Sequence, residues 1–464
     1  DIYTLSQHDA LPILIQAGNN MQTNCLFDRI TLVTADDQGR IVTTPNACVT
    51  VSGGFIRYVG QNLEAARESM GHEPFDCYDG RSRIILPALA NLHGHIAMSI
   101  FRNQTDDKNL QDWLINEIFP REARLSREIV RIGTRLGLAE MIRSGTGAAA
   151  DMYYFEEAVA EAALDAGFRV NLCCDAKQTL TDGRVELLPE RLSDRIRTCT
   201  GHASDLLRVS LLVHSVYLYD KGLYPDLADM AAGLDCPVQI HVSETRKEVE
   251  DCLRQFGCRP PRQLEKFGFF RTPTLAAHCT FLNEEDRQIL ARHKVVAAHN
   301  PTSNLKLGSG IADVPAMLAA GMQVGLGTDS AASNNNLDLY REMRLASFLA
   351  KGLTGDASVL PAASLLDMTT RTGMAGLGFS GSGRIAAGAA ADLQIINHDC
   401  PAMTPLGDPV SALVYSADVS CVESLMIAGR WLMKNRELTT IDEEKLLYEA
   451  RVVADRINAG SEII

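Results

Sequence analysis

The stretch Leu86–Met98, LPALANLHGHIAM, decides how the rest of the chain can be interpreted. An apolar run at residues 84–86 leads toward His93 and His95, which a single glycine separates. Because successive side chains of a β-strand alternate between its faces, both imidazoles would point to one side if the strand continues through them. Two imidazoles at a strand end can begin a metal site. Such a pair also arises by chance, so the later strand ends decide its meaning.

Length, composition and charge exclude several classes of protein. The chain has 464 residues, 46% hydrophobic and 22% charged, enough for a barrel of roughly 250 residues with a smaller second domain. The net charge of −14 argues against nucleic acid or an anionic membrane as partners and is compatible with a small-molecule substrate. No apolar run approaches the roughly 18 residues of a transmembrane helix. The 12 scattered cysteines form no CxxC pair, which favours free thiols in a reducing cytoplasm.

Eight strand-like segments alternate with helical ones in the middle of the chain. The first precedes His93, and the others are residues 146–153, 169–176, 208–215, 237–244, 274–280, 294–301 and 322–330. Helical periodicity lies between them, for example over residues 123–143, 156–166, 245–256, 284–293 and 312–320. This alternation predicts an α/β fold, a (β/α)8 TIM-type barrel over residues 86–377.

The two ends of the chain do not share the alternation of strands and helices seen in the middle. Residues 1–21 show no clear period, so we expect a non-native or disordered extension with Met21 as the natural start. Residues 22–85 and 378–437 are both strand-like, and neither is large enough to fold alone. They predict one small composite, β-sandwich-like domain built from both chain ends. Residues 438–464 follow as a C-terminal helix, predicted over 442–458, and a tail.

Ligand-type side chains gather at the predicted strand ends, where barrel enzymes carry their active sites. They are His93, His95, His214, His241, Glu244, His278, His299 and Asp329. A single histidine at a strand end is more often structural. Six of the chain's 11 histidines on one rim are poorly explained by chance and indicate a metal or catalytic site.

With these residues in place, the chain resembles the amidohydrolase superfamily. Within it, the chain is similar to the branch of methylthioadenosine/S-adenosylhomocysteine deaminases and related aminohydrolases. The segments that carry the resemblance are LHGHIAMSIFRN, DWLINEIFPREARLS, HVSET, AAHC, HNPTSNLKLGSGIA and GLGTDSAASNN. The resemblance spans about residues 24–438 and includes GRIAAGAAADL near the C-terminus.

The resemblance implies a metal-dependent deaminase with defined ligands. The implied ligands are His93, His95, His241 and Asp329, holding one zinc ion per subunit, although iron(II) also suits these donors. Glu244 matches the family's proton shuttle, and His278 matches the histidine that steadies the nucleophile and the developing oxyanion. Asp329 also counts as catalytic, since it can accept a hydrogen bond from the attacking water. Glu244 alternatively could serve a helix N-terminus, but its position after a ligand histidine favours catalysis.

Four further residues match substrate contacts of the branch. Trp113 and Glu122 match residues that contact the nucleoside, with the glutamate accepting the ribose hydroxyls, although Trp113 could equally pack in the core. His214 matches a purine contact. Arg184 matches one of two arginines that hold a substrate carboxylate, while the other position falls on Cys174. This departure favours substrates with an uncharged 5′ group.

The predicted function is hydrolytic deamination of an adenine nucleoside of the 5′-methylthioadenosine, 5′-deoxyadenosine, adenosine or S-adenosylhomocysteine type. One alternative is an aminohydrolase or chlorohydrolase of the same machinery acting on a guanine-type base, a pterin, a triazine or creatinine. A more distant one is a non-catalytic binding protein, which the complete ligand set disfavours. Family analogy implies a homo-oligomer, either a dimer or a tetramer.

Overall fold

The computed structural model describes residues 22–180, 185–201 and 205–459, so the predicted extension over residues 1–21 lies outside the described residues. Its central element is a parallel sheet of eight strands that curls into a barrel. In spatial order these strands are β6 (Leu89–Asn91), β7 (Thr146–Asp151), β8 (Arg169–Cys174), β11 (Leu207–Leu212), β12 (Val238–Val242), β13 (Thr274–His278), β14 (Val296–His299) and β15 (Gln323–Leu326). The backbone N–H of Leu92 donates to the Leu326 carbonyl at 2.9 Å and joins the first strand to the last. The predicted (β/α)8 barrel is confirmed.

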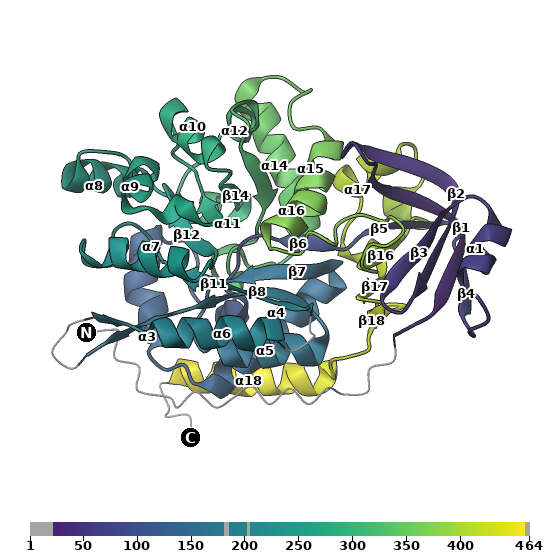
Figure 1. Cartoon of the computed structure of the whole chain (residues 1–464), viewed down its shortest axis with the longest axis horizontal. Coiled ribbons are helices and arrows are strands. Elements are labelled where there is room, and N and C mark those ends of the chain that lie inside the picture. The colour runs from purple at the N-terminus through teal and green to yellow at the C-terminus, as the bar shows by residue number, and fades with distance from the viewer. Residues whose placement is uncertain (1–21, 181–184, 202–204, 460–464) are drawn as a thin grey trace.

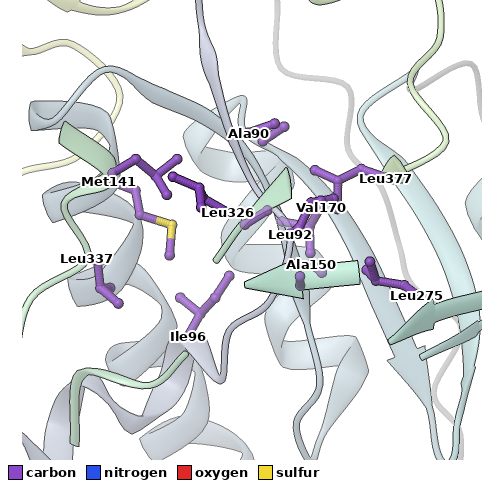
Figure 2. Close-up of a cluster of buried hydrophobic side chains, with 14 of the residues drawn as sticks. Ala90, Leu92, Ile96, Met141, Ala150, Val170, Leu275, Leu326, Leu337 and Leu377 are labelled. Carbon is purple, nitrogen blue, oxygen red and sulfur yellow. The ribbon is translucent and has the colours of Figure 1, made fainter. Parts of the chain in front are cut away.

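Apolar side chains fill the barrel and bind it to its helices. Every residue of β7 is buried, and its run of small alanines lets neighbouring elements approach closely. Figure 2 shows Leu92, Val170 and Leu326, which come from different parts of the barrel wall, gathered in one buried cluster. A parallel sheet covered on both faces requires such continuously apolar strands, because neither face meets water.

Polar side chains cap the N-termini of several helices between the strands. The main ones are α4 (Arg127–Arg143), α5 (Glu156–Ala166), α6 (Pro189–Gly201), α7 (Leu223–Gly233), α8 (Arg246–Phe256), α9 (Pro260–Phe267), α10 (Glu284–Arg292), α11 (Pro301–Lys306), α12 (Val314–Ala319), α14 (Leu339–Thr354), α15 (Ala362–Thr369) and α16 (Arg371–Gly376). The Thr245 hydroxyl accepts the Glu248 N–H at 3.1 Å and starts α8. Asn283 and Asp286 form a reciprocal capping box at α10. The predicted helix over residues 123–143 begins only at Arg127, because Ser126 caps it.

The second sheet draws strands from both ends of the chain. Its nine strands are β1 (Cys25–Ala35), β2 (Ile41–Ser52), β3 (Phe55–Gly60), β4 (Asp76–Asp79), β5 (Arg83–Pro87), β16 (Leu393–Asn397), β17 (Val422–Ile427), β18 (Arg430–Lys434) and β19 (Glu437–Leu438). The antiparallel pairing of β5 with β16 joins the N-terminal strands to the C-terminal ones. Figure 1 shows this sheet at one end of the molecule, with purple and yellow-green strands side by side. The division into residues 22–85 plus 378–437, 86–377 and 438–464 stays a prediction.

The junction between the two sheets corrects one expectation. The apolar run at residues 84–86 lies in β5 of the nine-stranded sheet, while the histidine pair follows the separate strand β6. That strand ends at Asn91, so it does not continue through His93 and His95. Pro87 and Ala88 explain the break, since the Ala88 N–H donates at 3.1 Å to the carbonyl of Asp392, the residue before β16 of the nine-stranded sheet.

The C-terminal helix α18 (Glu443–Ala459) packs against α4 along the outside of the barrel (Figure 1). Ion pairs fasten the two helices, among them Arg135 Nη1 to Glu449 Oε2 at 3.3 Å and the contact of Arg143 with Glu443. Among the described residues, no helix combines the length and the apolar character that crossing a membrane requires.

Candidate active site

Five side chains converge at the carboxyl ends of the barrel strands. His93 and His95 follow β6, His241 lies in β12, His278 ends β13, and Asp329 follows β15. The Asp329 Oδ1 atom lies 3.5 Å from His93 Nε2 and 3.3 Å from His95 Nε2. Ligand atoms of His93, His95 and His241 lie within 4.8 Å of one another, and so do those of His93, His278 and Asp329. The four predicted metal ligands therefore lie in one cluster.

Backbone carbonyls orient two of these imidazoles. His95 Nδ1 donates to the Met152 carbonyl at 2.5 Å, and His241 Nδ1 donates to the His214 carbonyl at 2.7 Å. These bonds fix the tautomer and leave the Nε2 lone pairs free for a metal. The buried His93 Nε2 has no hydrogen-bond partner among the described residues. Such an orphaned nitrogen, beside two more imidazoles and a carboxylate, fits a divalent transition metal.

The charge states also suit a metal. Burial lowers the pKa of His93 to about 4 and that of His241 well below its usual value, so both imidazoles are neutral at pH 7. Burial alone would raise the pKa of Asp329, but the neighbouring imidazoles, His93 foremost, hold it well below its ordinary value. Its Oδ2 accepts hydroxyls from Ser303 at 2.5 Å and Ser333 at 3.0 Å, which leaves Oδ1 facing the cluster.

Glu244 lies beside the cluster with its carboxylate in the cavity. Its Oε1 accepts the Ser309 hydroxyl at 3.2 Å, and its Oε2 lies 3.8 Å from His278 Nε2. His278 is oriented in turn, since its Nδ1 donates to Asn304 Oδ1 at 2.7 Å. Burial raises the pKa of Glu244, as a group that exchanges protons near neutral pH requires. The cap of α8 is the neighbouring Thr245.

The backbone at this rim adopts unfavourable conformations. His278 and Asp329 have φ values of 70° and 59°, a region that non-glycine residues rarely adopt. Such strain is typical of functional sites, where the surrounding structure holds side chains in a set direction. Gly327 has no room for a side chain, because a Cβ atom would lie 2.3 Å from Asn300 Oδ1 and 2.8 Å from the His93 nitrogen.

A cavity open to solvent extends outward from the cluster. Trp113 and Glu122, both buried, line it together with His214. Burial raises the pKa of Glu122 to about 7, although the nearby Tyr153 opposes the rise. His214 is also held neutral, because burial lowers its pKa to about 3. Three of the four predicted substrate contacts thus share one cavity with the metal cluster, and Arg184 lies outside the described residues.

The sequence analysis missed several residues of the cavity wall. Tyr153 and Tyr154, which follow β7, line it. Asp175 and Lys177 line it too, and the signal available for them was their position directly after a barrel strand. Cys174 is not among the described residues that line the cavity, and its sulfur lies 3.8 Å from a Glu156 oxygen instead. His299, one of the ligand-type residues at the predicted strand ends, is buried at the end of β14 and is not among the described residues that line the cavity.

The comparisons with known proteins agree with this geometry. The amidohydrolase family model matches residues 84–432. A relative from Acetivibrio thermocellus named 5-methylthioadenosine/S-adenosylhomocysteine deaminase is 39% identical over 435 residues, covering 94% of this chain and 99% of the relative. A solved adenosine deaminase from Xanthomonas campestris with bound zinc has a TM-score of 0.87 at 31% identity, covering 94% of this chain and 99% of the other. A zinc complex of atrazine chlorohydrolase from Arthrobacter aurescens has a TM-score of 0.80 at 25% identity, covering 93% and 100%.

Proposed function

The chain belongs to the amidohydrolase family, and from that premise we propose that it deaminates an adenine nucleoside. Membership makes it a hydrolase that acts on carbon–nitrogen bonds other than peptide bonds. In the proposed reaction, water replaces the exocyclic amine of the adenine ring, which becomes a carbonyl group, and ammonia leaves. The observation that carries the proposal is the shared cavity, in which a three-histidine, one-carboxylate cluster adjoins Glu244 and a wall of mostly aliphatic and aromatic side chains.

We assign metal binding to His93, His95, His241 and Asp329, and zinc is the ion that this donor set suits best. When bound, such an ion acts as a Lewis acid and lowers the pKa of water from 15.7 toward about 7, which supplies a hydroxide nucleophile at neutral pH. The zinc in the solved adenosine deaminase relative supports the choice of metal. Iron(II) fits the same donors and is the alternative.

We assign the proton transfers to Glu244. Its carboxylate takes a proton from the attacking water, delivers it to the ring nitrogen beside the reacting carbon, and later protonates the departing amine. Its raised pKa supports both halves of this exchange. Burial lowers the pKa of His278, but Glu244 and Asp329 outweigh burial and raise it, so a protonated His278 can donate from both ring nitrogens. Its Nε2, 3.8 Å from Glu244 Oε2, donates to the oxygen on which negative charge develops. Asp329 accepts a hydrogen bond from the attacking water, which aligns the lone pair for attack.

Substrate binding falls to the outer part of the cavity. Glu122 accepts hydrogen bonds from the 2′ and 3′ hydroxyls of the ribose, since an ionised carboxylate has two acceptor oxygens for a cis-diol. Trp113 packs on the nucleoside, and His214 contacts the purine. The buried indole nitrogen of Trp113 and Nδ1 of His214, neither with a partner among the described residues, support these roles, because a bound ligand could satisfy them.

A deamination screen on zinc-loaded protein tests the proposal. The panel holds adenosine, 5′-methylthioadenosine, 5′-deoxyadenosine, S-adenosylhomocysteine, adenine, guanine, a pterin and a triazine, with metal content measured on the same sample. We expect turnover of adenine nucleosides with about one metal ion per chain. If one metal ion is bound but only a free base or a triazine is turned over, the family chemistry stands and the nucleoside assignment falls. A stoichiometric ligand returned unchanged would indicate a binding protein.

We also propose a cytoplasmic location and a homo-oligomeric state. All 12 cysteines are free thiols, which supports a reducing compartment. The oligomeric state rests on analogy with the family, with a dimer or tetramer expected. Sedimentation equilibrium on the purified protein tests it, and a single species with the mass of one chain would contradict it.

A further inference from the structure

A buried carboxylate beside the proposed proton shuttle has no part in the reaction described so far. Glu248 lies in the first turn of α8 and is only 5% exposed. Its Oε1 accepts the backbone N–H of Ser243 at 2.8 Å, and its Oε2 accepts that of Glu244 at 2.7 Å. The two carboxylate oxygens therefore bind consecutive amides of the segment that carries Glu244.

An ordinary helix cap would use this glutamate differently. The sequence from Thr245 to Glu248 has the S/T-x-x-E pattern of a capping box, in which the glutamate accepts the N–H of the capping residue itself. Half of that arrangement is present, since the Thr245 hydroxyl accepts the Glu248 N–H at 3.1 Å. The Glu248 carboxylate, however, binds the two residues that precede Thr245. Thr245 therefore caps the helix, while the carboxylate holds the loop before it.

The loop that these bonds hold has an unfavourable backbone conformation. Ser243 has a φ value of 49°, in the left-handed region that non-glycine residues rarely adopt. The peptide group between Ser243 and Glu244 is held at both of its polar atoms, because its carbonyl accepts the Phe281 N–H at 3.0 Å and its N–H donates to Glu248. Such a conformation persists only where the surrounding structure stabilises it. Here it leads the chain from His241, in β12, to Glu244, whose side chain lines the cavity.

The side chain of Glu244 is held more loosely than its main chain. Its Oε1 accepts the Ser309 hydroxyl at 3.2 Å, whereas its Oε2 lies 3.8 Å from His278 Nε2, beyond hydrogen-bond distance. A proton shuttle must face the attacking water first and a ring nitrogen afterwards, so fixed donors on both of its oxygens would hinder it. Its placement must then come from the main chain, and small errors in the placement of a catalytic group are costly.

A carboxylate is an expensive choice for a purely structural bond at this position. Burial raises the pKa of Glu248 to about 7, although the amides of Ser243 and Glu244 oppose the rise. The charged side chains that influence this pKa are Glu244 and His278, and neither supplies a permanent positive charge. Glutamine suits a capping box equally well, but it has one acceptor oxygen and would turn its NH₂ group toward the second amide. The buried carboxylate therefore indicates a role that needs two acceptors.

Resting on the function proposed above, we propose that Glu248 is a positioning residue for the proton shuttle. Its carboxylate fixes the main chain of Ser243 and Glu244, so that the Glu244 carboxylate begins each turnover where it can take a proton from water and deliver it to the ring. Glu248 is not among the described residues that line the cavity, and it exchanges no proton with the substrate. It acts only through Glu244.

A double-mutant cycle separates positioning from a structural role. The variants are Glu248→Gln, Glu244→Gln and the two combined, each loaded with zinc and assayed at pH 8 with the best substrate of the deamination panel. The readouts are kcat, KM, metal content, thermal unfolding and amide hydrogen exchange of the peptide over residues 242–246. Glu284→Gln is the matched control, because it makes the same substitution at an exposed position in the first turn of α10. Thr245→Val removes the cap of α8 and keeps the Glu248 carboxylate.

We expect Glu248→Gln to lower kcat by about 10- to 100-fold with KM changed less than about twofold, as for loss of a group that orients a catalytic residue. In the Glu244→Gln background the same change should cost less than about threefold, because no shuttle is left to position. Glu248→Gln alone of the single variants speeds amide exchange over residues 242–246 while metal content stays at the wild-type value. Thr245→Val lowers the unfolding temperature and retains kcat, and Glu284→Gln behaves as wild type.

An equal fall in kcat in the wild-type and Glu244→Gln backgrounds would overturn the positioning role, since the effect would not pass through the shuttle. A fall in Thr245→Val as large as that in Glu248→Gln would overturn it too, because the start of α8 would then matter rather than the carboxylate. If Glu248→Gln does not fold, Glu248→Asp, which is one methylene too short to bind both amides, takes its place in the cycle. Unchanged kcat in Glu248→Gln overturns only the positioning role, whereas metal-loaded wild type that turns over no panel member overturns the deaminase function itself.

Discussion

Replacing Glu122 by glutamine tests the physical basis of the proposed ribose contact through stability and activity together. The side chain is 8% exposed, and burial raises its pKa from 4.5 to about 7. In the unfolded chain the group ionises near 4.5, so the folded protein holds an extra proton between these two values. Stability is therefore lost as the pH rises through this window. The difference between about 7 and 4.5, at 1.36 kcal/mol per pKa unit, amounts to roughly 3 kcal/mol.

Glutamine cannot ionise, so the variant does not lose this stability as the pH rises. We expect Glu122→Gln and wild type to have similar stability at pH 4.5, and the variant to be more stable by up to about 3 kcal/mol at pH 8. Calorimetric or urea unfolding at both pH values measures the difference. The matched control is Glu444→Gln, which makes the same substitution at an exposed position of α18.

The same variant loses function. An amide offers one acceptor oxygen where the carboxylate offers two, and loss of a charge-assisted hydrogen bond is worth about 1.5–3 kcal/mol. This predicts a drop of about 10- to 100-fold in kcat/KM for adenine ribosides at pH 8. Undiminished kcat/KM would refute the diol contact. A stability difference that is the same at pH 4.5 and pH 8 would refute the burial argument.

The remaining predictions concern the metal, the proton shuttle and the junction of the two sheets. His241→Ala should purify with little metal and lose nearly all turnover, and chelation of wild type followed by added zinc should remove and restore activity; full activity in the metal-free protein would contradict the ligand assignment. Glu244→Gln should retain its metal while kcat falls by about 10²–10⁴-fold, measured by stopped assays, and an unchanged kcat would remove Glu244 from the mechanism. Arg169→Met should cost about 3–5 kcal/mol of stability in unfolding experiments, because it leaves the buried Asp392 carboxylate without the guanidinium that lies 2.6 Å away. Replacing the exposed Arg197, which pairs with Asp194 at the surface, should cost far less.

Periodicity was enough to predict the barrel. Strands buried on both faces need continuous apolar runs, whereas amphipathic helices show a 3.6-residue period. The alternation of these two patterns can therefore be recognised in the sequence. The helix over residues 156–166 was predicted with the bounds that α5 has in the structure. The grouping of ligand-type residues at strand ends could also be predicted, because the parallel strands of a barrel all place their carboxyl ends on one rim.

The change from one sheet to the other after β5 could not be predicted from the sequence. Residues 84–92 form one nearly continuous apolar stretch, yet β5 pairs with β16 and β6 pairs with β7. Local sequence does not record which of two sheets will supply the hydrogen bonds, since both offer the same backbone partners. Only the contact between distant chain segments made that choice.

The sequence by itself thus indicated which residues to propose as metal ligands and as the proton shuttle, because side-chain type and position at the strand ends carried both the pattern and the family resemblance. The tertiary structure alone decided what surrounds them. It left Nε2 of His93 without a hydrogen-bond partner among the described residues, raised the pKa of Glu122 through burial, and brought Lys177 and Asp175 into the cavity. Burial and proximity arise when segments far apart in the chain pack together, and no local pattern specifies them.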